Sequence, residues 1–452
     1  MPWKEVSPGK WERPLDSSEI LLKLQADEFQ SKNKEHWALN IHAVVRFDGT
    51  PQQEVVAALR LAWIQTRYHH PLIAAQLSGT NHVYQVPDAT GVETWANETF
   101  IVDNKESAAD FWLTSQLMDY PSLYYFSKTS ELVMRIHHWL IDGMGGMNLL
   151  DRFLTYLSSE TTIPSFGSEY VRLPPTHKES AGLPAKASPA AEAAAQDALV
   201  SYVSKFPSVG LPFLSGTAGG TRVFRLGSSS STLSSLLAQT RKHELGFAAA
   251  VQAAVALATR ERAPKAISKQ PFLTTAFFNH RKYLQEPYNN STKWPMSVWM
   301  MALPISQPEA DFTTTAKNFQ AMYGQDLTVG KNFATEWWDA FCFHFGEVLL
   351  MPLPDGMPLP SQPQLSSIGS LDGFIKARYE GKIAVEVMDV EPVVENMRPQ
   401  VMVFQWSFAG KWYLNACYNE NLYAEGEVEA FLKRTREILF KELGVEEVDA
   451  WC

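Results

Sequence analysis

The spacing of apolar residues switches between helical and strand periodicity along the whole chain of 452 residues. The first half carries helical spacing over residues 17–29 and 51–66 and strand-like alternation over 37–47 and 131–138. The second half repeats this mixture and ends in an amphipathic helix over residues 426–443. Such alternation is typical of layered α/β proteins, so we expect mixed sheets flanked by helices.

A change of composition divides the chain into two halves. Between Thr176 and Ala195 the residues are mostly Pro, Ala, Ser, Lys and Glu, and such a segment buries too little apolar surface to offset the entropy of ordering it. We interpret it as a surface linker within a crossover over residues 176–215. The prediction is an N-terminal lobe over residues 1–175 and a C-terminal lobe over residues 216–452.

Composition narrows the class of protein further. Hydrophobic residues make up 45% and charged residues 19% of the chain, which excludes a disordered protein, and no apolar run reaches the length of a membrane-spanning helix. The 39 basic residues against 49 acidic ones lack the positive excess that binding a phosphate backbone requires. The three cysteines are widely spaced, and the first residues show no signal-peptide pattern. We expect a cytoplasmic monomer without a nucleic-acid partner, a membrane partner or a metal site.

The most informative segment is RIHHWLIDGMGG at residues 135–146, which places two histidines, an aspartate and three glycines at the end of a predicted strand. Imidazole exchanges a proton near neutral pH, and it needs a partner that fixes its orientation. Glycines allow a tight turn that leaves a histidine accessible. The same string also fits a strand, a turn and a helix cap around a buried structural histidine. The pattern alone leaves both interpretations open.

The string HHWLIDG at residues 137–143 resembles the HHxxxDG signature of the chloramphenicol-acetyltransferase-like superfamily. This superfamily includes plant acyltransferases, condensation domains of peptide synthetases and fungal trichothecene acetyltransferases. RYHHPL at 67–72 and FRL at 224–226 are similar to segments that precede the early strands and open the second lobe of that family. The resemblance covers nearly the whole chain. It implies two chloramphenicol-acetyltransferase-like lobes, each a mixed sheet flanked by helices, with an active-site tunnel between them.

The resemblance also implies roles for residues of the HHxxxDG loop. The family places its catalytic base four residues before the aspartate, which is His138 here. Neighbouring side chains of a strand point to opposite faces, so we interpret His137 as a packed neighbour. We expect Asp142 to act as a brace, which means that it holds the histidine loop in place and accepts no proton during the reaction. Gly143 is expected to support the turn.

Two further segments resemble parts of the family site. In Asn279-His280-Arg281, Arg281 is similar to the arginine that pairs with the aspartate of the histidine motif, and a guanidinium can hold a buried carboxylate through two hydrogen bonds. Ser366 and Ser367, in SSIGS, are similar to a Ser/Thr-rich turn beside the reacting carbonyl, which makes them candidate oxyanion or substrate contacts. Each segment also fits ordinary surface or loop chemistry.

Other histidines and tryptophans fit structural roles. The remaining histidines have no acidic residue at a metal-binding or catalytic spacing, and several tryptophans fit a core or the lining of a channel. These residues are His42, His69, His70, His280, His344, Trp294, Trp299, Trp337 and Trp338.

The chain lacks the Asp-Phe-Gly-Trp-Gly motif of plant members and the attachment site of a carrier protein. It therefore most resembles stand-alone fungal secondary-metabolite acyltransferases of the trichothecene 15-O-acetyltransferase kind. This resemblance implies a CoA-dependent O-acyltransferase with no bound cofactor, in which acyl-CoA, expected to be acetyl-CoA, is the co-substrate and a small-molecule hydroxyl is the acceptor. The alternatives are a condensation-type enzyme that forms an amide or ester or closes a ring, and a degenerate member that only binds a small molecule.

Overall fold

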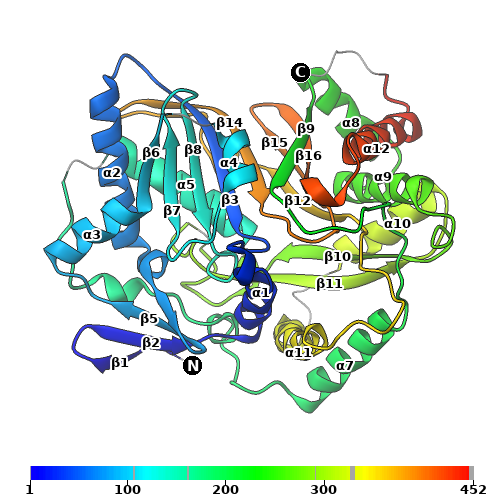
Figure 1. Ribbon diagram of the computed structural model, residues 1–452, viewed down its shortest axis with the longest axis horizontal. Coiled ribbons are helices and arrows are strands. Elements are labelled where there is room, and N and C mark those ends of the chain that lie inside the picture. Colours follow the sequence, from blue (N-terminus) through cyan, green and yellow to red (C-terminus); the bar gives the residue numbers. More distant parts are fainter. Residues whose placement is uncertain (1, 105–106, 160–161, 291, 326–330, 447–452) are drawn as a thin grey trace.

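The computed structural model describes residues 2–104, 107–159, 162–290, 292–325 and 331–446, and within them the chain forms two lobes that lie side by side (Figure 1). The strands are β1 (Lys4–Ser7), β2 (Lys10–Pro14), β3 (Leu39–Phe47), β4 (Gln76–Ser78), β5 (Asn81–Gln85), β6 (Phe100–Asp103), β7 (Ser122–Phe126), β8 (Glu131–Ile136), β9 (Thr221–Gly227), β10 (Phe272–Asn279), β11 (Met300–Gln307), β12 (Gln364–Ser370), β13 (Arg378–Tyr379), β14 (Val385–Val394), β15 (Met402–Phe408) and β16 (Lys411–Asn419). The helices are α1 (Ser17–Asp27), α2 (Gln52–His69), α3 (Ala89–Thr99), α4 (Ala108–Thr114), α5 (Gly143–Ser159), α6 (His177–Ser180), α7 (Pro189–Val203), α8 (Ser230–Lys242), α9 (Phe247–Arg262), α10 (Phe312–Tyr323), α11 (Lys331–Leu349) and α12 (Glu427–Leu443).

Each lobe is built around one mixed sheet. The first lobe has six strands in the order β13-β14-β3-β8-β7-β6, and the second has four in the order β12-β15-β16-β9. A smaller sheet, β1-β2-β5-β4, joins the first lobe, and the β10–β11 hairpin lies below the second (Figure 1). Helices cover both sheets, so the expected two-lobed α/β architecture is confirmed.

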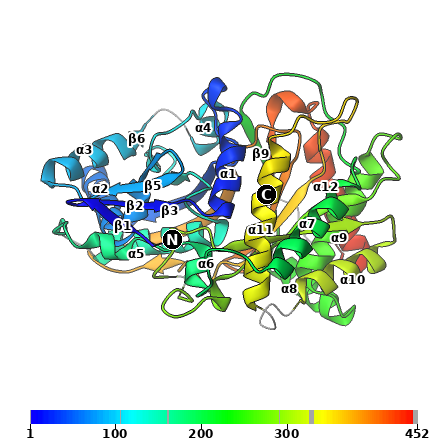
Figure 2. The same cartoon turned by 90° about the horizontal axis from the view of Figure 1, so that it is seen from below.

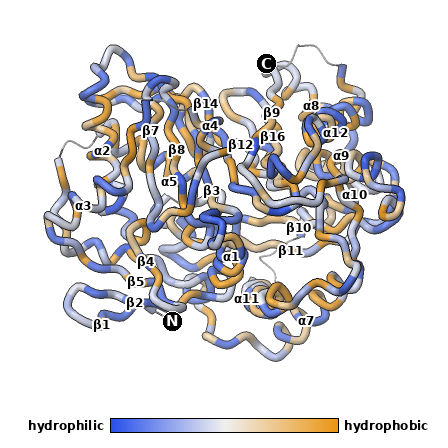
Figure 3. Tube along the Cα trace, viewed as in Figure 1, coloured by the Kyte–Doolittle hydropathy of each residue, from blue (hydrophilic) through white to orange (hydrophobic). Residues whose placement is uncertain are grey.

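The helix that follows the HHxxxDG loop packs closely on the central sheet of the first lobe. Hydrophobic residues run along β7 and β8 (Figure 3), and the side chains of β8 are buried from Leu132 to Ile136. A Cβ added at Gly146 of α5 would lie 2.7 Å from Cδ1 of Ile41 in β3, so glycine is what allows this approach. The loop that carries the two histidines is thereby fixed between β8 and α5.

The two halves of the sequence do not form two separate sheets. β14, from the second half, pairs antiparallel with β3 along its length, from Val385 opposite Phe47 to Val394 opposite Leu39. Together with β13 it extends the sheet of the first lobe. Helix α1 of the first half in turn lies beside α11 of the second (Figure 2). The lobes are therefore joined by exchanged elements, which holds the loop of the first lobe against the hairpin of the second.

The segment over Thr176–Ala195 is not an exposed linker throughout. It contains α6 and the beginning of α7, and Ala191 and Ala195 are buried. The composition argument failed because the small alanines of α7 let it pack against aromatic side chains of α11, among them Trp338. The ends of the two lobes at residues 175 and 216 remain predictions from the sequence.

Most predicted elements form, with two local differences. The apolar pattern of residues 72–77 predicts a strand, but the structure has a 3-10 turn over Pro71–Ala74 followed by the short β4, since Pro71 has no N–H for a ladder. The apolar spacing of residues 148–157 predicts a helix, and in the structure this helix begins earlier, at Gly143. In the described ranges no helix is long and apolar enough to cross a membrane.

Candidate active site

The loop between β8 and α5 is closed by hydrogen bonds of Asp142. Its Oδ1 accepts a hydrogen bond from the Gly145 N–H at 2.8 Å, as the side chain at the start of a helix does. Its Oδ2 accepts one from the Trp299 N–H at 2.8 Å, and its own N–H donates to the Ser297 carbonyl at 3.1 Å. Asp142 thus connects the loop of the first lobe to the segment that leads into β11.

Asp142 and Arg281 form a buried ion pair. Nη1 of Arg281 donates to Oδ1 of Asp142 at 2.8 Å and to Oδ2 at 2.7 Å. The two residues are 2% and 1% exposed, so neither charge is solvated by bulk water. The expected two hydrogen bonds are present, but a single nitrogen makes both.

The second terminal nitrogen of Arg281 holds the segment before β11. Nη2 donates to the Ser297 carbonyl at 3.1 Å and to Oγ of Ser297 at 3.0 Å. Asn279, at the end of β10, accepts a hydrogen bond from the Arg281 N–H at 3.2 Å and so fixes the turn. Sequence reasoning missed the contacts of Ser297 and Trp299. Ser297 contributes its carbonyl and its hydroxyl and Trp299 its backbone N–H, and no spacing in the sequence indicates these contacts.

Gly145 is the position of the loop that tolerates a side chain least. A Cβ there would lie 2.3 Å from the Pro295 carbonyl and 2.9 Å from Nη2 of Arg281, whereas one at Gly143 would meet only Cδ1 of Ile368, at 3.8 Å. Gly145→Ala is expected to lower the free energy of unfolding by about 1–3 kcal/mol through overpacking. Gly143→Ala is the matched control, and its free energy of unfolding should be close to that of the unaltered protein. Denaturant midpoints measure both, and equal effects would contradict this account of the packing.

His138 is half-buried in the turn that follows β8, and its ring lies near that of Trp37, with centroids 6.4 Å apart. Burial lowers the pKa of His138, and the backbone of His138 and Ile141 and the carboxylates of Asp142 and Glu35 offset this only in part. Its Nδ1 is buried, and no described group makes a well-aligned hydrogen bond to it. The ring is therefore neutral at neutral pH, in the form that can accept a proton.

His137 is held by other partners than the residues around His138. Its Nδ1 lies 2.6 Å from Oε2 of Glu35, and its ring stacks on Trp139 with centroids 4.7 Å apart. It is 5% exposed, as expected for a packed neighbour. Glu35 lies 102 residues away, and no sequence spacing indicated this pair.

Ser366 and Ser367 lie on strand β12, which is parallel to β15, rather than in a turn. The Ser367 hydroxyl accepts a hydrogen bond from Nε2 of Gln405 at 2.7 Å. Ser366 is on the opposite face, with Gln364, whose Oε1 accepts hydrogen bonds from Thr275 of β10. A bulge follows Ser367, and the bulged residue, Ile368, is the one that approaches Gly143. The serine segment therefore lies beside the HHxxxDG loop.

Two histidines interpreted as lacking acidic partners do have them. His42 of β3 lies 3.0 Å from Oε1 of Glu131 and 3.7 Å from Oε2 of Glu391. Burial opposes its charge, but the two carboxylates raise its pKa to about 9. His344 similarly lies 2.6 Å from Glu192. The spacing argument failed because these carboxylates come from other strands and helices. Among the described residues no group of histidines, cysteines and carboxylates could hold a metal ion.

The chain is similar over nearly its full length to proteins named as acetyltransferases. No protein-family model matches it. It is 28% identical to acetyltransferase pigO of Monascus ruber, over 98% of this chain and 99% of the relative. It is 27% identical to O-acetyltransferase pigM of the same organism, over 99% of this chain and 88% of the relative.

Solved structures show the same fold. The TRI3 trichothecene 15-O-acetyltransferase from Fusarium sporotrichioides superposes with a TM-score of 0.82 at 18% identity, over 97% of each chain. The first condensation domain of the calcium-dependent antibiotic synthetase superposes with a TM-score of 0.64 at 13% identity, over 98% of each chain. The fold is therefore that of the chloramphenicol-acetyltransferase-like superfamily. The full-length similarity to two proteins named as acetyltransferases supports an acyltransferase with this fold.

Proposed function

We propose that the protein is an acetyl-CoA-dependent O-acetyltransferase that acts on a hydroxyl of a small-molecule secondary metabolite. The observation that carries the proposal is a neutral, partly accessible His138 on a loop that Asp142 and Arg281 hold rigid. The full-length similarity to two proteins named as acetyltransferases supports the acyl group. We further propose that both substrates reach His138 through a tunnel between the two lobes.

His138 is the proposed general base. Its neutral imidazole accepts the proton of the acceptor hydroxyl while the oxygen attacks the thioester carbonyl of acetyl-CoA. The tetrahedral intermediate then expels the CoA thiolate, to which the imidazolium returns the proton. The products are the acetyl ester and free CoA, with no covalent enzyme intermediate. Asp142 takes no proton in this scheme, since its carboxylate already accepts hydrogen bonds from Arg281, Gly145 and Trp299.

Ser366 is the proposed donor to the oxyanion. Its hydroxyl makes no side-chain hydrogen bond to another described residue, whereas that of Ser367 is engaged by Gln405. Ser366→Ala is expected to lower kcat by about 10²-fold, the usual effect of losing one such donor. Ser367→Ala should have a smaller effect. Steady-state release of free thiol measures both rates, and the reverse order of effects would assign the donor to Ser367.

The pH dependence of the reaction follows from the environment of His138. Burial holds its pKa below the ordinary value of 6.5, and the base must be unprotonated to act. kcat/KM is therefore expected to be flat at and above neutral pH and to fall only below pH 6.5, as protonation removes the base. A pH profile of thiol release measures this. An acid limb centred above pH 7 would contradict the neutral, desolvated imidazole.

The reaction itself is tested with acetyl-CoA and a panel of hydroxylated and amino acceptors of matched skeleton. We expect release of free thiol and a product about 42 mass units heavier than the hydroxyl acceptor. This gain in mass is the replacement of one hydrogen by one acetyl group. The likeness to a condensation domain favours a second candidate, amide formation. Transfer to amines alone would establish that alternative. If acetyl-CoA gave no transfer to any acceptor, the proposal that acetyl-CoA is the donor would be wrong.

A further inference from the structure

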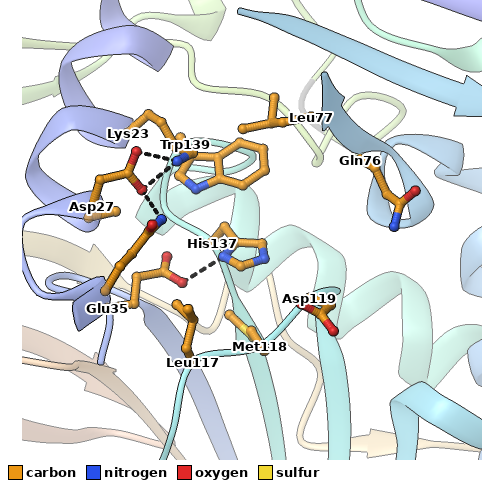
Figure 4. A pocket seen from close by; sticks show the side chains of 12 residues that line it. Lys23, Asp27, Glu35, Gln76, Leu77, Leu117, Met118, Asp119, His137 and Trp139 are labelled. Carbon is orange, nitrogen blue, oxygen red and sulfur yellow. Dashed lines mark hydrogen bonds and ion pairs between the residues drawn. The ribbon is translucent and has the colours of Figure 1, made fainter. Parts of the chain in front are cut away.

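The turn over residues 35–37, which precedes β3, contacts both histidines of the HHxxxDG loop. Oε2 of Glu35 lies 2.6 Å from Nδ1 of His137 (Figure 4). The indole of Trp37 lies beside the imidazole of His138, with ring centroids 6.4 Å apart and ring planes inclined by 45°. β3 pairs antiparallel with β8, and this pairing brings the turn to the end of the strand that leads into the loop.

The backbone of Trp37 is in the left-handed region, with φ at 65°. A bulky side chain rarely adopts this conformation, which glycine and asparagine adopt more easily. Two hydrogen bonds hold it, since the Trp37 N–H donates to the Glu395 carbonyl at 2.7 Å and the Glu395 N–H donates to the Ala38 carbonyl at 2.9 Å. A strained residue persists only where the surrounding structure imposes it, and such residues cluster at functional sites. The indole is therefore held in a fixed place beside the loop.

Trp37 is less buried than its neighbours in the turn. Glu35, His36 and Ala38 are 2%, 1% and 0% exposed, whereas Trp37 is half-buried, as is His138. The ring separation lies in the range of favourable aromatic pairs. The indole therefore covers one side of the imidazole, and the rest of that ring stays partly accessible.

The orientation of the His138 ring is not fixed by a strong hydrogen bond. Its Nδ1 is buried, and no described group makes a well-aligned hydrogen bond to it. Among the described residues, Trp37 supplies the aromatic contact of this imidazole. Packing against the indole is therefore the contact that can hold the ring in one orientation.

Three titratable groups act on the imidazole of His138 electrostatically. They are Glu35, Asp142 and His36. Each carboxylate already has a partner, as Glu35 contacts His137 and Asp142 forms its ion pair in the loop. Burial holds the pKa of His36 well below its ordinary value, so His36 is neutral. None of the three replaces the packing contact with the indole.

We propose that Trp37 is a positioning residue for acyl transfer, whose indole holds the imidazole of His138 in one orientation and shields one side of it from water. The proposal rests on the proposed role of His138 as the general base. Without the indole, the imidazole can turn away from the acceptor hydroxyl and becomes more hydrated. Trp37 itself exchanges no proton and forms no bond in the reaction.

The first measurement is an NMR titration of His138, in protein carrying ¹³C at Cε1 of its histidines, with His138→Ala to assign the resonance. Trp37→Gly removes the indole and introduces the residue that best tolerates a φ of 65°. Because water then reaches the imidazole, the pKa of His138, which burial lowers, should rise toward 6.5. Trp11→Ala is the matched control, since it removes another half-buried indole, stacked on Tyr170 at 4.5 Å, and should leave the titration unchanged.

The second measurement is the rate of thiol release at pH 8, with a thermal melt of each variant to verify folding. Trp37→Leu keeps apolar bulk but no ring, and it should lower kcat by about 2- to 10-fold, the usual value of one aromatic pair, at unchanged KM for acetyl-CoA. Trp37→Phe keeps a ring and should restore most of kcat. These two variants decide the question if Trp37→Gly fails to fold.

The two measurements separate this proposal from the proposed function. The titration needs neither acetyl-CoA nor an acceptor. If no variant and no unaltered protein releases thiol, the proposed donor is wrong, and the titration alone decides the role of Trp37. An unchanged pKa of His138 in Trp37→Gly, the same shift in Trp11→Ala, or an unchanged kcat in Trp37→Leu would each overturn the proposal.

Discussion

His138→Ala is expected to lower kcat/KM for acetyl transfer by about 10²–10⁴-fold, the contribution of one positioned general base. The fold should be retained, since the side chain is only half-buried and its Nδ1 makes no well-aligned hydrogen bond to a described group. The measurement is the rate of thiol release from acetyl-CoA, with a thermal melt of the same preparation to verify folding.

The control for His138→Ala is His69→Ala. His69 is also part of a His-His pair, and burial lowers its pKa too, but it stacks on Tyr156, far along the chain from the loop. We expect it to keep most of the activity. A His138→Ala protein that is folded and fully active would remove the general base from the mechanism. Equal losses in both variants would show that the effect is one of stability.

The core of the site could be predicted from sequence because its chemistry is local. His138, Asp142 and Gly143 lie within six residues, and their types and order carry the resemblance to the superfamily. Arg281 could be added, since it sits in a short motif of its own at the end of a predicted strand. The structure brings its guanidinium to Asp142 across 139 residues of sequence.

What could not be predicted depends on contacts between distant segments. Glu35 reaches His137 only because the segment before β3 passes the end of β8, its partner in the sheet. β14 lies beside β3 although it comes from the other half of the sequence, and the apolar pattern of a strand does not show which strand it pairs with. Composition also misjudged α7, whose alanines are buried by an aromatic partner helix that the periodicity did not reveal.

Asp142→Ala is expected to reduce the free energy of unfolding by about 3–5 kcal/mol, because it leaves the buried guanidinium of Arg281 without its counter-charge. It also removes the acceptor of the Gly145 and Trp299 N–H groups, so the start of α5 and the entry to β11 lose a shared anchor. Activity should fall as a consequence of lost geometry at His138. Denaturant midpoints measure the stability, and a surface pair provides the comparison. Arg434→Ala, which breaks the exposed contact with Glu261, should cost only about 0–1 kcal/mol.

The double variant Asp142→Ala with Arg281→Ala tests whether Asp142 stabilises the protein through its ion pair with Arg281 or independently of it. The free energies of unfolding of the single and double variants are compared. If the ion pair carries the effect, the double change costs less than the sum of the two single changes by about 0.5–3 kcal/mol, because no buried charge is left unpaired. Asp142→Asn adds a second criterion, since it keeps the size of the side chain but removes its charge toward Arg281. A brace predicts that Asp142→Asn loses stability and activity together, whereas a proton-transfer role predicts loss of activity at unchanged stability. Additive penalties in the cycle would show that the 2.7 Å contact contributes nothing, and Asp142 would then act on His138 by its charge alone.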